Sequence, residues 1–263
     1  MKGWRADAAI HADHSPRSDR AEAPRRRSSS HYHQPPEAAI HIVPFTELLP
    51  PWRTVPPDQQ SRLSVAPAGT VWCAGDITLL RQRCVAVVGT REVSPDGASR
   101  ARRLARELTE AGVIVVSGLA RGVDTHALSS AVDSSGRVVA VIGTPIDKAY
   151  PAENAELQER IYREHLLVSQ FAPGSRTFKS NFPERNKLMA ALSDATVIVE
   201  AGDKSGTLHQ ATECVRLQRW LFIARSVLTD TRYTWPSTFA SYAKMRQLNE
   251  TTDVLGALAE LGA

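Results

Sequence analysis

The sequence predicts an α/β fold whose mostly parallel sheet is covered by helices on both faces. Short, fully apolar runs alternate with longer segments in which apolar residues recur every three or four positions. The run Cys84–Gly89 has the composition of a strand buried on both faces. Residues 96–111 then place Ala98, Ala101 and Leu104 on one helical face. Such alternation is typical of a parallel sheet.

The same pattern continues toward the C-terminus. Further strands are expected at 113–116, Val138–Ile142, Leu166–Ser169, 196–200 and 220–223. Helices are expected at 124–134, 151–164, 184–193 and 206–218. Because right-handed crossovers bring the carboxyl ends of parallel strands to one edge of the sheet, the loops after these strands should meet there.

Composition divides the chain into three regions. Residues 1–58 are rich in Ser, Pro, Arg and His, and we expect a disordered tail because they bury too little apolar surface to offset the entropy of ordering. Residues 59–230 carry the alternating pattern and form the core domain. Residues 231–263 are expected to add a helical extension packed on the core, since large apolar side chains recur there at helical spacing: Trp235, Phe239, Tyr242, Met245 and Leu248.

The totals exclude several classes of protein. The chain has 263 residues, 42% of them hydrophobic, and lacks the run of roughly 18 apolar residues that a membrane span needs. The N-terminal segment has no apolar stretch typical of a secretory signal. Cys73, Cys84 and Cys214 show no paired spacing, so neither a zinc ribbon nor a disulfide framework is indicated. We expect a cytoplasmic protein without a metal or cofactor.

Two glycine-containing loops follow the first two core strands. Gly89, Thr90 and Arg91 stand at the end of the first strand, where glycine permits a close approach and the hydroxyl and guanidinium groups suit phosphate. The segment 117–122, with Ser117, Gly118, Arg121 and Gly122, has the pattern of an anion-binding nest at a helix N-terminus. Asp124 is expected to cap that helix.

Two further segments bring cations to helix starts. Lys204, Ser205, Gly206 and Thr207 follow an apolar strand and precede a helix, although they do not match the Walker A order. In the segment 182–187, Phe182 stands beside Arg185, Asn186 and Lys187. A base stacked on this ring, with phosphates held by the cations, would suit single-stranded nucleic acid.

These loops predict a polyanionic ligand, either a nucleotide or a nucleic-acid strand. The net charge of +4 is too small to argue for such a ligand, so local placement has to carry the interpretation. We therefore expect four cations to share one rim of the sheet: Arg91, Arg121, Lys187 and Lys204. No G-x-S-x-G elbow is present and the acidic residues are scattered, so no catalytic residue is expected.

Taken together, these motifs resemble the DNA-processing protein A family (DprA/Smf) over roughly residues 70–225. The resemblance is carried by the segments 85–91, 117–124, 150–154, 182–187, 192–193, 199–201 and 205–207. It implies an extended Rossmann-like, doubly wound sheet that binds single-stranded DNA without catalysis. It also implies a role in recombination and natural transformation, loading of the RecA recombinase and a homodimer.

The expected strand-binding residues combine this resemblance with the loop patterns. They are Gly89, Thr90, Arg91, Ser117, Gly118, Arg121, Gly122, Phe182, Arg185, Asn186, Lys187, Lys204, Ser205, Gly206 and Thr207.

Some positions depart from the family pattern. The usual His after the second motif is replaced by Leu128, and Ala224, Arg225 and Ser226 stand where Pro-Gly is usual. We expect neither the small helical domain nor the winged helix that the resemblance associates with the flanks of the core. These departures weigh against RecA loading more than against DNA binding.

A Rossmann-like nucleotide sensor or nucleotide-processing enzyme is the alternative. The related cytokinin-activating phosphoribohydrolases carry a glutamate three residues after Gly-Thr, and that position here is Gln210. Because an amide cannot act as a general base, hydrolysis is disfavoured, whereas nucleotide sensing stays open.

Overall fold

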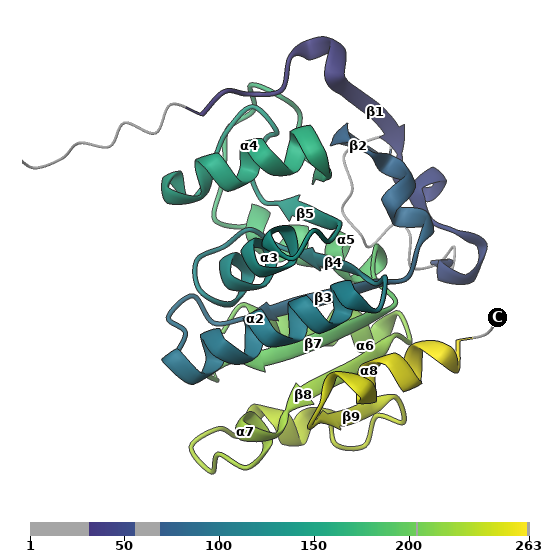
Figure 1. Ribbon diagram of the computed structural model, residues 1–263, viewed down its shortest axis with the longest axis vertical. Coiled ribbons are helices and arrows are strands. Elements are labelled where there is room, and N and C mark those ends of the chain that lie inside the picture. The colour runs from purple at the N-terminus through teal and green to yellow at the C-terminus, as the bar shows by residue number, and fades with distance from the viewer. Residues whose placement is uncertain (1–31, 56–68, 204, 262–263) are drawn as a thin grey trace, which may run out of the picture.

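The computed structural model describes residues 32–55, 69–203 and 205–261, which form one nine-stranded sheet (Figure 1). The strand order is β1-β2-β6-β5-β4-β3-β7-β8-β9. The strands from β6 to β9 in this order run parallel, whereas β1 and β2 are joined antiparallel at one edge. The expected α/β fold with a mostly parallel sheet is confirmed.

Six parallel strands coincide closely with the predicted apolar runs. They are β3 (Cys84–Gly89), β4 (Ile114–Ser117), β5 (Val138–Ile142), β6 (Leu166–Ser169), β7 (Ala195–Glu200) and β8 (Trp220–Ala224). All residues of β4, β5, β6 and β8 are buried. Helices on both faces of the sheet therefore explain why these strands show no polar alternation.

The helices form a layer on each side of the sheet (Figure 1). One layer contains α2 (Pro95–Glu110), α3 (Val123–Asp133), α4 (Ala155–Glu164) and α8 (Thr251–Ala259). The opposite layer contains α5 (Asn181–Ala191) and α6 (Thr207–Arg216). The short helix α7 (Arg225–Leu228) follows β8.

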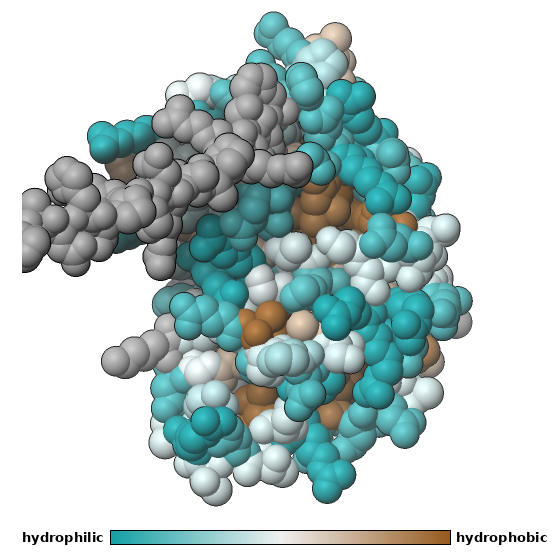
Figure 2. Space-filling view, turned by 60° about the vertical axis from the view of Figure 1, so that its left-hand side comes forward, coloured by the Kyte–Doolittle hydropathy of each residue, from teal (hydrophilic) through white to brown (hydrophobic). Residues whose placement is uncertain are grey.

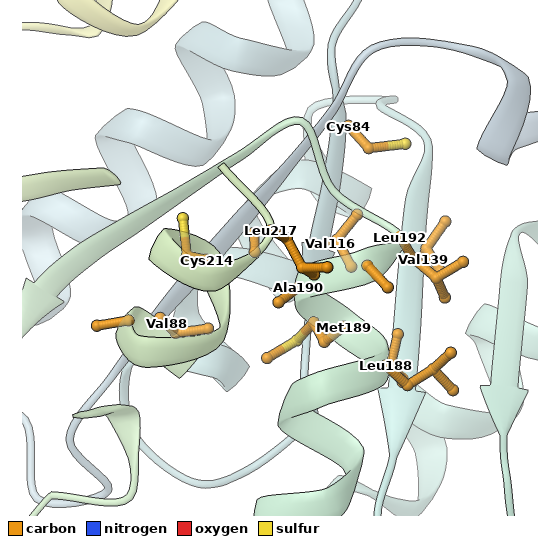
Figure 3. Close-up of a cluster of buried hydrophobic side chains, with 14 of the residues drawn as sticks. Cys84, Val88, Val116, Val139, Leu188, Met189, Ala190, Leu192, Cys214 and Leu217 are labelled. Atoms are coloured by element: carbon orange, nitrogen blue, oxygen red, sulfur yellow. The ribbon is translucent and has the colours of Figure 1, made fainter. Parts of the chain in front are cut away.

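Each layer encloses a hydrophobic core. In the layer of α5 and α6, Leu188, Met189 and Cys214 pack with Val88 of β3 (Figure 3). On the other face, residues of α2, α3 and α4 pack against the same strands. This two-sided burial fixes the positions of the strand ends, and thereby of the loops that follow them.

The N-terminal region departs from the expected tail. Residues 32–55 belong to the fold: β1 (Ile40–Pro44) pairs with β2 (Thr70–Gly75), and η2 (Phe45–Leu48) contributes buried Phe45 and Leu48 to the core. Their few apolar residues suffice because they complete an existing core rather than form a new one. Residues 1–31 and 56–58 lie outside the described part of the chain, and the disorder expected there stays a prediction.

Arg53, at the end of η3 (Pro51–Arg53), attaches this region to the core. Its side chain is fully buried and donates to the Asp194 carboxylate through Nε at 3.1 Å and Nη2 at 2.5 Å. It also donates to the carbonyl oxygens of Leu80 and Gln82 at 2.9 and 2.6 Å. Asp194 accepts in addition from the backbone N–H of Cys84 at 2.8 Å. The buried charges are thus paired and hydrogen-bonded, as low-dielectric surroundings require.

The C-terminal region is not the single helical extension that the spacing predicted. Trp235 and Phe239 lie in a 3-10 turn, η7 (Trp235–Phe239), whereas β9 (Met245–Leu248) adds a parallel strand beside β8. Within the described residues 231–261, α8 after β9 is the one α-helix. The indole of Trp235 donates to the Ala201 carbonyl at 3.1 Å, which fixes the turn against the end of β7.

The surface shown in Figure 2 is mainly hydrophilic, with small hydrophobic patches between polar residues. Among the described residues, no helix is both long and apolar enough to cross a membrane. The described residues also include no group of three or more His, Cys, Asp or Glu side chains arranged to hold a metal ion.

Replacing Arg53 by Met is expected to lower the free energy of unfolding by about 3–5 kcal/mol, because Asp194 would remain buried without its main partner. Urea denaturation measures this loss. Arg81→Met, at an exposed position of the neighbouring η5 (Ile77–Arg81), is the control and should change stability by less than about 0.5 kcal/mol. Equal losses in both variants would contradict a specific role for Arg53.

The three cysteines are expected to be unreactive in the folded protein. Cys73, Cys84 and Cys214 are buried, and this burial raises the pKa of each thiol to about 12. Because the thiolate is the reactive form, Ellman's reagent should detect the thiols only after denaturation. A thiol that reacts rapidly before unfolding would show that one of these sites is open.

Candidate functional site

An open groove of about 650 Å³ lies at the carboxyl edge of the sheet. The end of β3, the loops after β4 and β7, and the N-terminal halves of α5 and α6 form its walls. Nine of the predicted binding residues line it: Gly89, Thr90, Arg91, Phe182, Arg185, Asn186, Ser205, Gly206 and Thr207. The expected meeting of loops at this edge is therefore found in the structure.

The loop after β3 is anchored at the floor of the groove. A side chain at Gly89 would approach Val123 Cγ2 to 2.5 Å and the Glu200 carbonyl oxygen to 2.7 Å, so only glycine fits. The Thr90 N–H donates to the same carbonyl at 2.7 Å. These contacts join β3 to β7 and direct the exposed Arg91 side chain into the groove lining.

The loop after β4 does not offer the anion-binding nest that its sequence predicted. Asp124 is buried, and its carboxylate accepts from the N–H groups of Gly118 at 3.1 Å and Ala120 at 3.3 Å. Ser117 is also buried and donates its hydroxyl to the Val87 carbonyl at 2.7 Å. The donors expected to meet an anion are thus occupied by the protein itself.

Asp124 is consequently not the helix N-cap that we predicted. The N-cap position of α3 is instead occupied by Gly122, which has a φ of 76° and has no side chain with which to cap the helix. A side chain there would collide with the carbonyl oxygens of Thr90 and Arg91, so the glycine lets the loops after β3 and β4 lie against each other. Asp124 organises the turn that precedes its own helix.

Arg185 of α5 connects this turn to the neighbouring strand. Its Nη1 donates to the carbonyl oxygens of Gly118 and, at 2.7 Å, Val141, while Nε donates to Asn186 Oδ1 at 2.9 Å. Burial lowers the pKa of the guanidinium, and the nearby charge of Arg91 acts in the same direction, whereas Asp124 opposes them. Arg185 is only 4% exposed, so its main role is structural: it fixes the wall of the groove rather than meeting a ligand.

Aromatic side chains form one side of the groove. Phe182 packs on Gly143, where an added Cβ would lie 2.7 Å from the ring. The Tyr150 ring lies 5.4 Å from that of Phe182 at a tilt of 47°, and the Arg91 guanidinium lies 5.4 Å from the Phe182 ring centroid. Tyr150 is 51% exposed. The groove therefore presents an aromatic surface with a cation beside it.

The loop after β7 forms the opposite side. Ser205 Oγ accepts from the Thr207 N–H at 3.2 Å, and Asn186 Nδ2 donates to the Gly206 carbonyl at 3.1 Å. The latter bond joins α5 to this loop. Lys204, which was expected to bind phosphate, lies outside the described residues.

The expected rim of four cations is not present as predicted. Arg91 lines the groove, but Arg121 and Lys187 do not. Arg121 pairs with Glu153 at 2.6 Å, and Lys187 pairs with Glu184 at 2.9 Å on its own helix. Ser117, Gly118 and Gly122 are likewise absent from the lining and support the loops behind it.

Sequence reasoning did not assign eleven of the lining residues to the site, among them Tyr150 and Lys179 beside Phe182 and the exposed Glu92 and His209. Tyr150 and Lys179 both lie near Phe182: Tyr150 through its ring, and Lys179 because its carbonyl accepts from the Phe182 N–H at 3.4 Å. The signal for Lys179 was its position just before α5, within a segment that also carries Arg176 and the exposed Phe178.

Residues 52–253 match the family model of DNA recombination-mediator protein A. The chain belongs to this family. It is 40% identical over 156 residues to the DNA processing protein DprA of Streptococcus pneumoniae. This aligned region covers 59% of this chain and 55% of the relative. It is 40% identical over 138 residues to protein Smf of Synechocystis, covering 52% and 35%. The chain thus spans only part of the length of these curated relatives.

Solved structures of the DNA recombination-mediator family share the fold. The S. pneumoniae protein superimposes with a TM-score of 0.66 at 32% identity, covering 74% of this chain and 69% of that one. DNA processing protein A from Helicobacter pylori, whose structure concerns its single-stranded DNA binding mode, gives a TM-score of 0.66 at 26% identity. That match covers 79% of this chain and 94% of the H. pylori chain.

Arg185→Met is expected to lower the free energy of unfolding by about 3–5 kcal/mol, because Asp124 loses its opposing charge and two buried carbonyls lose a donor. Lys187→Met, on the same helix, is the matched control; it removes only a partly exposed pair and should cost less than about 1 kcal/mol. Thermal and urea unfolding measure both values. A stable Arg185→Met variant would contradict the structural role of Arg185.

Proposed function

We propose that this protein binds single-stranded DNA in the groove, without catalysis, as part of DNA processing in recombination and natural transformation. The observation that carries the proposal is the aromatic and cationic surface formed by Phe182, Tyr150 and Arg91 at the carboxyl edge of the sheet. Stacking surfaces beside cations suit single strands because every base offers a π-face and every linkage a phosphate. The H. pylori relative with its single-stranded DNA binding mode supports this proposal.

In this proposal, the two sides of the groove contact different parts of the strand. One or two bases stack on Phe182 and Tyr150. Arg91 and Lys179, for which the structure records no ion pair with a described residue, contact phosphates. Ser205, Gly206 and Thr207 provide hydroxyl and backbone groups on the opposite side. Stacking and phosphate contacts depend little on the identity of the base, so little sequence preference is expected.

The two buried acceptors that line the groove, Gln210 and Asp124, are engaged by the protein itself. Gln210 is fully buried and hydrogen-bonds with Thr196 Oγ1 at 3.1 Å, which ties α6 to β7. Asp124 is occupied by two backbone N–H groups and faces Arg185. A general base needs an accessible acceptor near the substrate, and neither residue provides one.

Three further parts of the proposal rest on the family. The protein acts in the cytoplasm and forms a homodimer, and the third part is transfer of its strand to RecA, which the departures from the family pattern at Leu128 and 224–226 weigh against. Analytical ultracentrifugation of the full chain tests the dimer, and strand exchange in the presence of RecA tests the transfer. Absence of either property would remove that part and leave DNA binding in place.

Phe182→Leu is expected to weaken binding of oligo(dT) by about 1–3 kcal/mol, because a stacking surface is lost while an apolar side chain remains. Phe182→Tyr should retain most of the affinity. Fluorescence anisotropy at several salt concentrations measures both. Arg91→Gln should also reduce the slope of log K against log[salt] by about 0.7, as expected for one lost phosphate contact to a single strand.

Arg121→Gln is the matched control for Arg91→Gln, because it removes the same charge from a residue outside the groove. It should leave the slope nearly unchanged. Equal effects of the two arginine variants would place the strand elsewhere. Thermal shifts with mononucleotides, compared with short oligonucleotides, separate DNA binding from nucleotide sensing: stabilisation by mononucleotides alone would favour a sensor.

A further inference from the structure

A second cavity, of about 300 Å³, lies at the same carboxyl edge but on the side of α2 and α8. Three arginines from separate parts of the fold line it: Arg100 and Arg103 from α2, and Arg225 from the segment that follows β8. Glu250 is the one acidic residue in its lining, as far as the described residues show. Its carboxylate accepts the N–H of Asp253 in the capping box of α8. The lining therefore carries an excess of positive charge.

The arginines have hydrogen-bonding capacity to spare. Arg100 approaches Glu200 only to 3.6 Å, and its buried Nε has no partner. Arg103 approaches Glu107 only to 4.0 Å. The structure records no ion pair between the Arg225 side chain and a described residue. A guanidinium group fits two oxygens of a phosphate at once, so three arginines around one cavity, one of them with an unpaired buried Nε and two of them exposed, favour a phosphate-bearing ligand.

This cavity and the groove both adjoin the end of β7. Val199 lines the arginine cavity, and Gly202, three residues later, lines the groove. Three residues of chain span at most about 11 Å. Between them, Glu200 accepts from the N–H of Ser94 at 3.0 Å and from its hydroxyl at 2.5 Å, which keeps this carboxylate engaged with the protein.

We propose that the cavity formed by Arg100, Arg103 and Arg225 is a second phosphate-binding site. Its ligand is the backbone of the same strand after that strand leaves the groove across the end of β7; this identification of the ligand rests on the proposed function. A free phosphate or a nucleotide would present the same phosphate group to these arginines, and the experiment distinguishes such a small ligand from a DNA strand. Binding at two sites would make affinity depend on strand length.

The test compares Arg103→Gln/Arg225→Gln with Arg106→Gln/Arg160→Gln. The control removes the same charge from two exposed arginines outside both sites, and Arg106 pairs with Glu110 on α2 much as Arg103 pairs with Glu107. Anisotropy is measured with oligo(dT) of about 6 nucleotides, enough for one site, and of about 20 nucleotides. Circular dichroism verifies folding, and Arg103→Lys/Arg225→Lys provides a second variant that keeps the charge.

The expected result is a loss of about tenfold in affinity for the long oligonucleotide, and a fall in its salt slope of about 1.4 for two lost contacts, in the test variant only. The Arg103→Lys/Arg225→Lys variant keeps both charges but loses the bidentate guanidinium geometry, so its salt slope should stay closer to that of the wild type than its affinity does. Binding of the short oligonucleotide should not change. If the test and control variants bind the long oligonucleotide equally while the short one still binds, this inference is overturned and the proposed function stands.

If neither oligonucleotide binds the wild-type protein, the proposed function fails and thermal shifts with inorganic phosphate and thymidine monophosphate decide the second site. Greater stabilisation of the wild type than of Arg103→Gln/Arg225→Gln would support a phosphate site with a small ligand. Equal shifts in the two proteins would overturn the site altogether.

Discussion

The arrangement of the groove depends on a buried guanidinium group. Arg185 reaches from α5 to the carbonyl oxygens of Gly118 after β4 and Val141 in β5, and thereby joins a helix on one face of the sheet to two strand ends. Asp124 balances its charge while holding the N–H groups of the same turn. A buried charge without such partners would be strongly destabilising, so each of these groups requires the others. The consequence is a rigid wall against which Phe182, on the adjacent turn of α5, is held toward the ligand side.

This wall separates the residues that hold the groove from those free to meet a ligand. Ser117, Gly118 and Gly122 stand behind it, whereas Arg91, Phe182 and Lys179 line the open side. Binding in this arrangement depends on a few local cations and rings rather than on a broadly basic surface, which agrees with a net charge of only +4. At the opposite end of β3, the buried ion pair of Arg53 and Asp194 attaches the N-terminal segment to the core.

The sequence was sufficient for the parallel core because burial on both faces leaves an unambiguous apolar signal in each strand. It was insufficient where short segments complete an existing surface: β1 contains polar His41, and β9 reads Met-Arg-Gln-Leu. At the site, the sequence indicated which loops meet but not which donors are already occupied. Arg121 and Arg91 look equivalent in sequence, yet Glu153, thirty-two residues further on, pairs with Arg121. Such long-range partners become visible only once the chain is folded.

The central claim is that a single strand lies across Phe182 and Tyr150. Photocrosslinking tests it most directly, with an oligo(dT) in which one base is replaced by 5-iodouracil and the adduct is located by mass spectrometry. The account predicts adducts on peptides containing Phe182 or Tyr150, and their loss in the presence of unlabelled oligo(dT). Adducts confined to aromatic residues distant from the groove, such as Trp52, would contradict it.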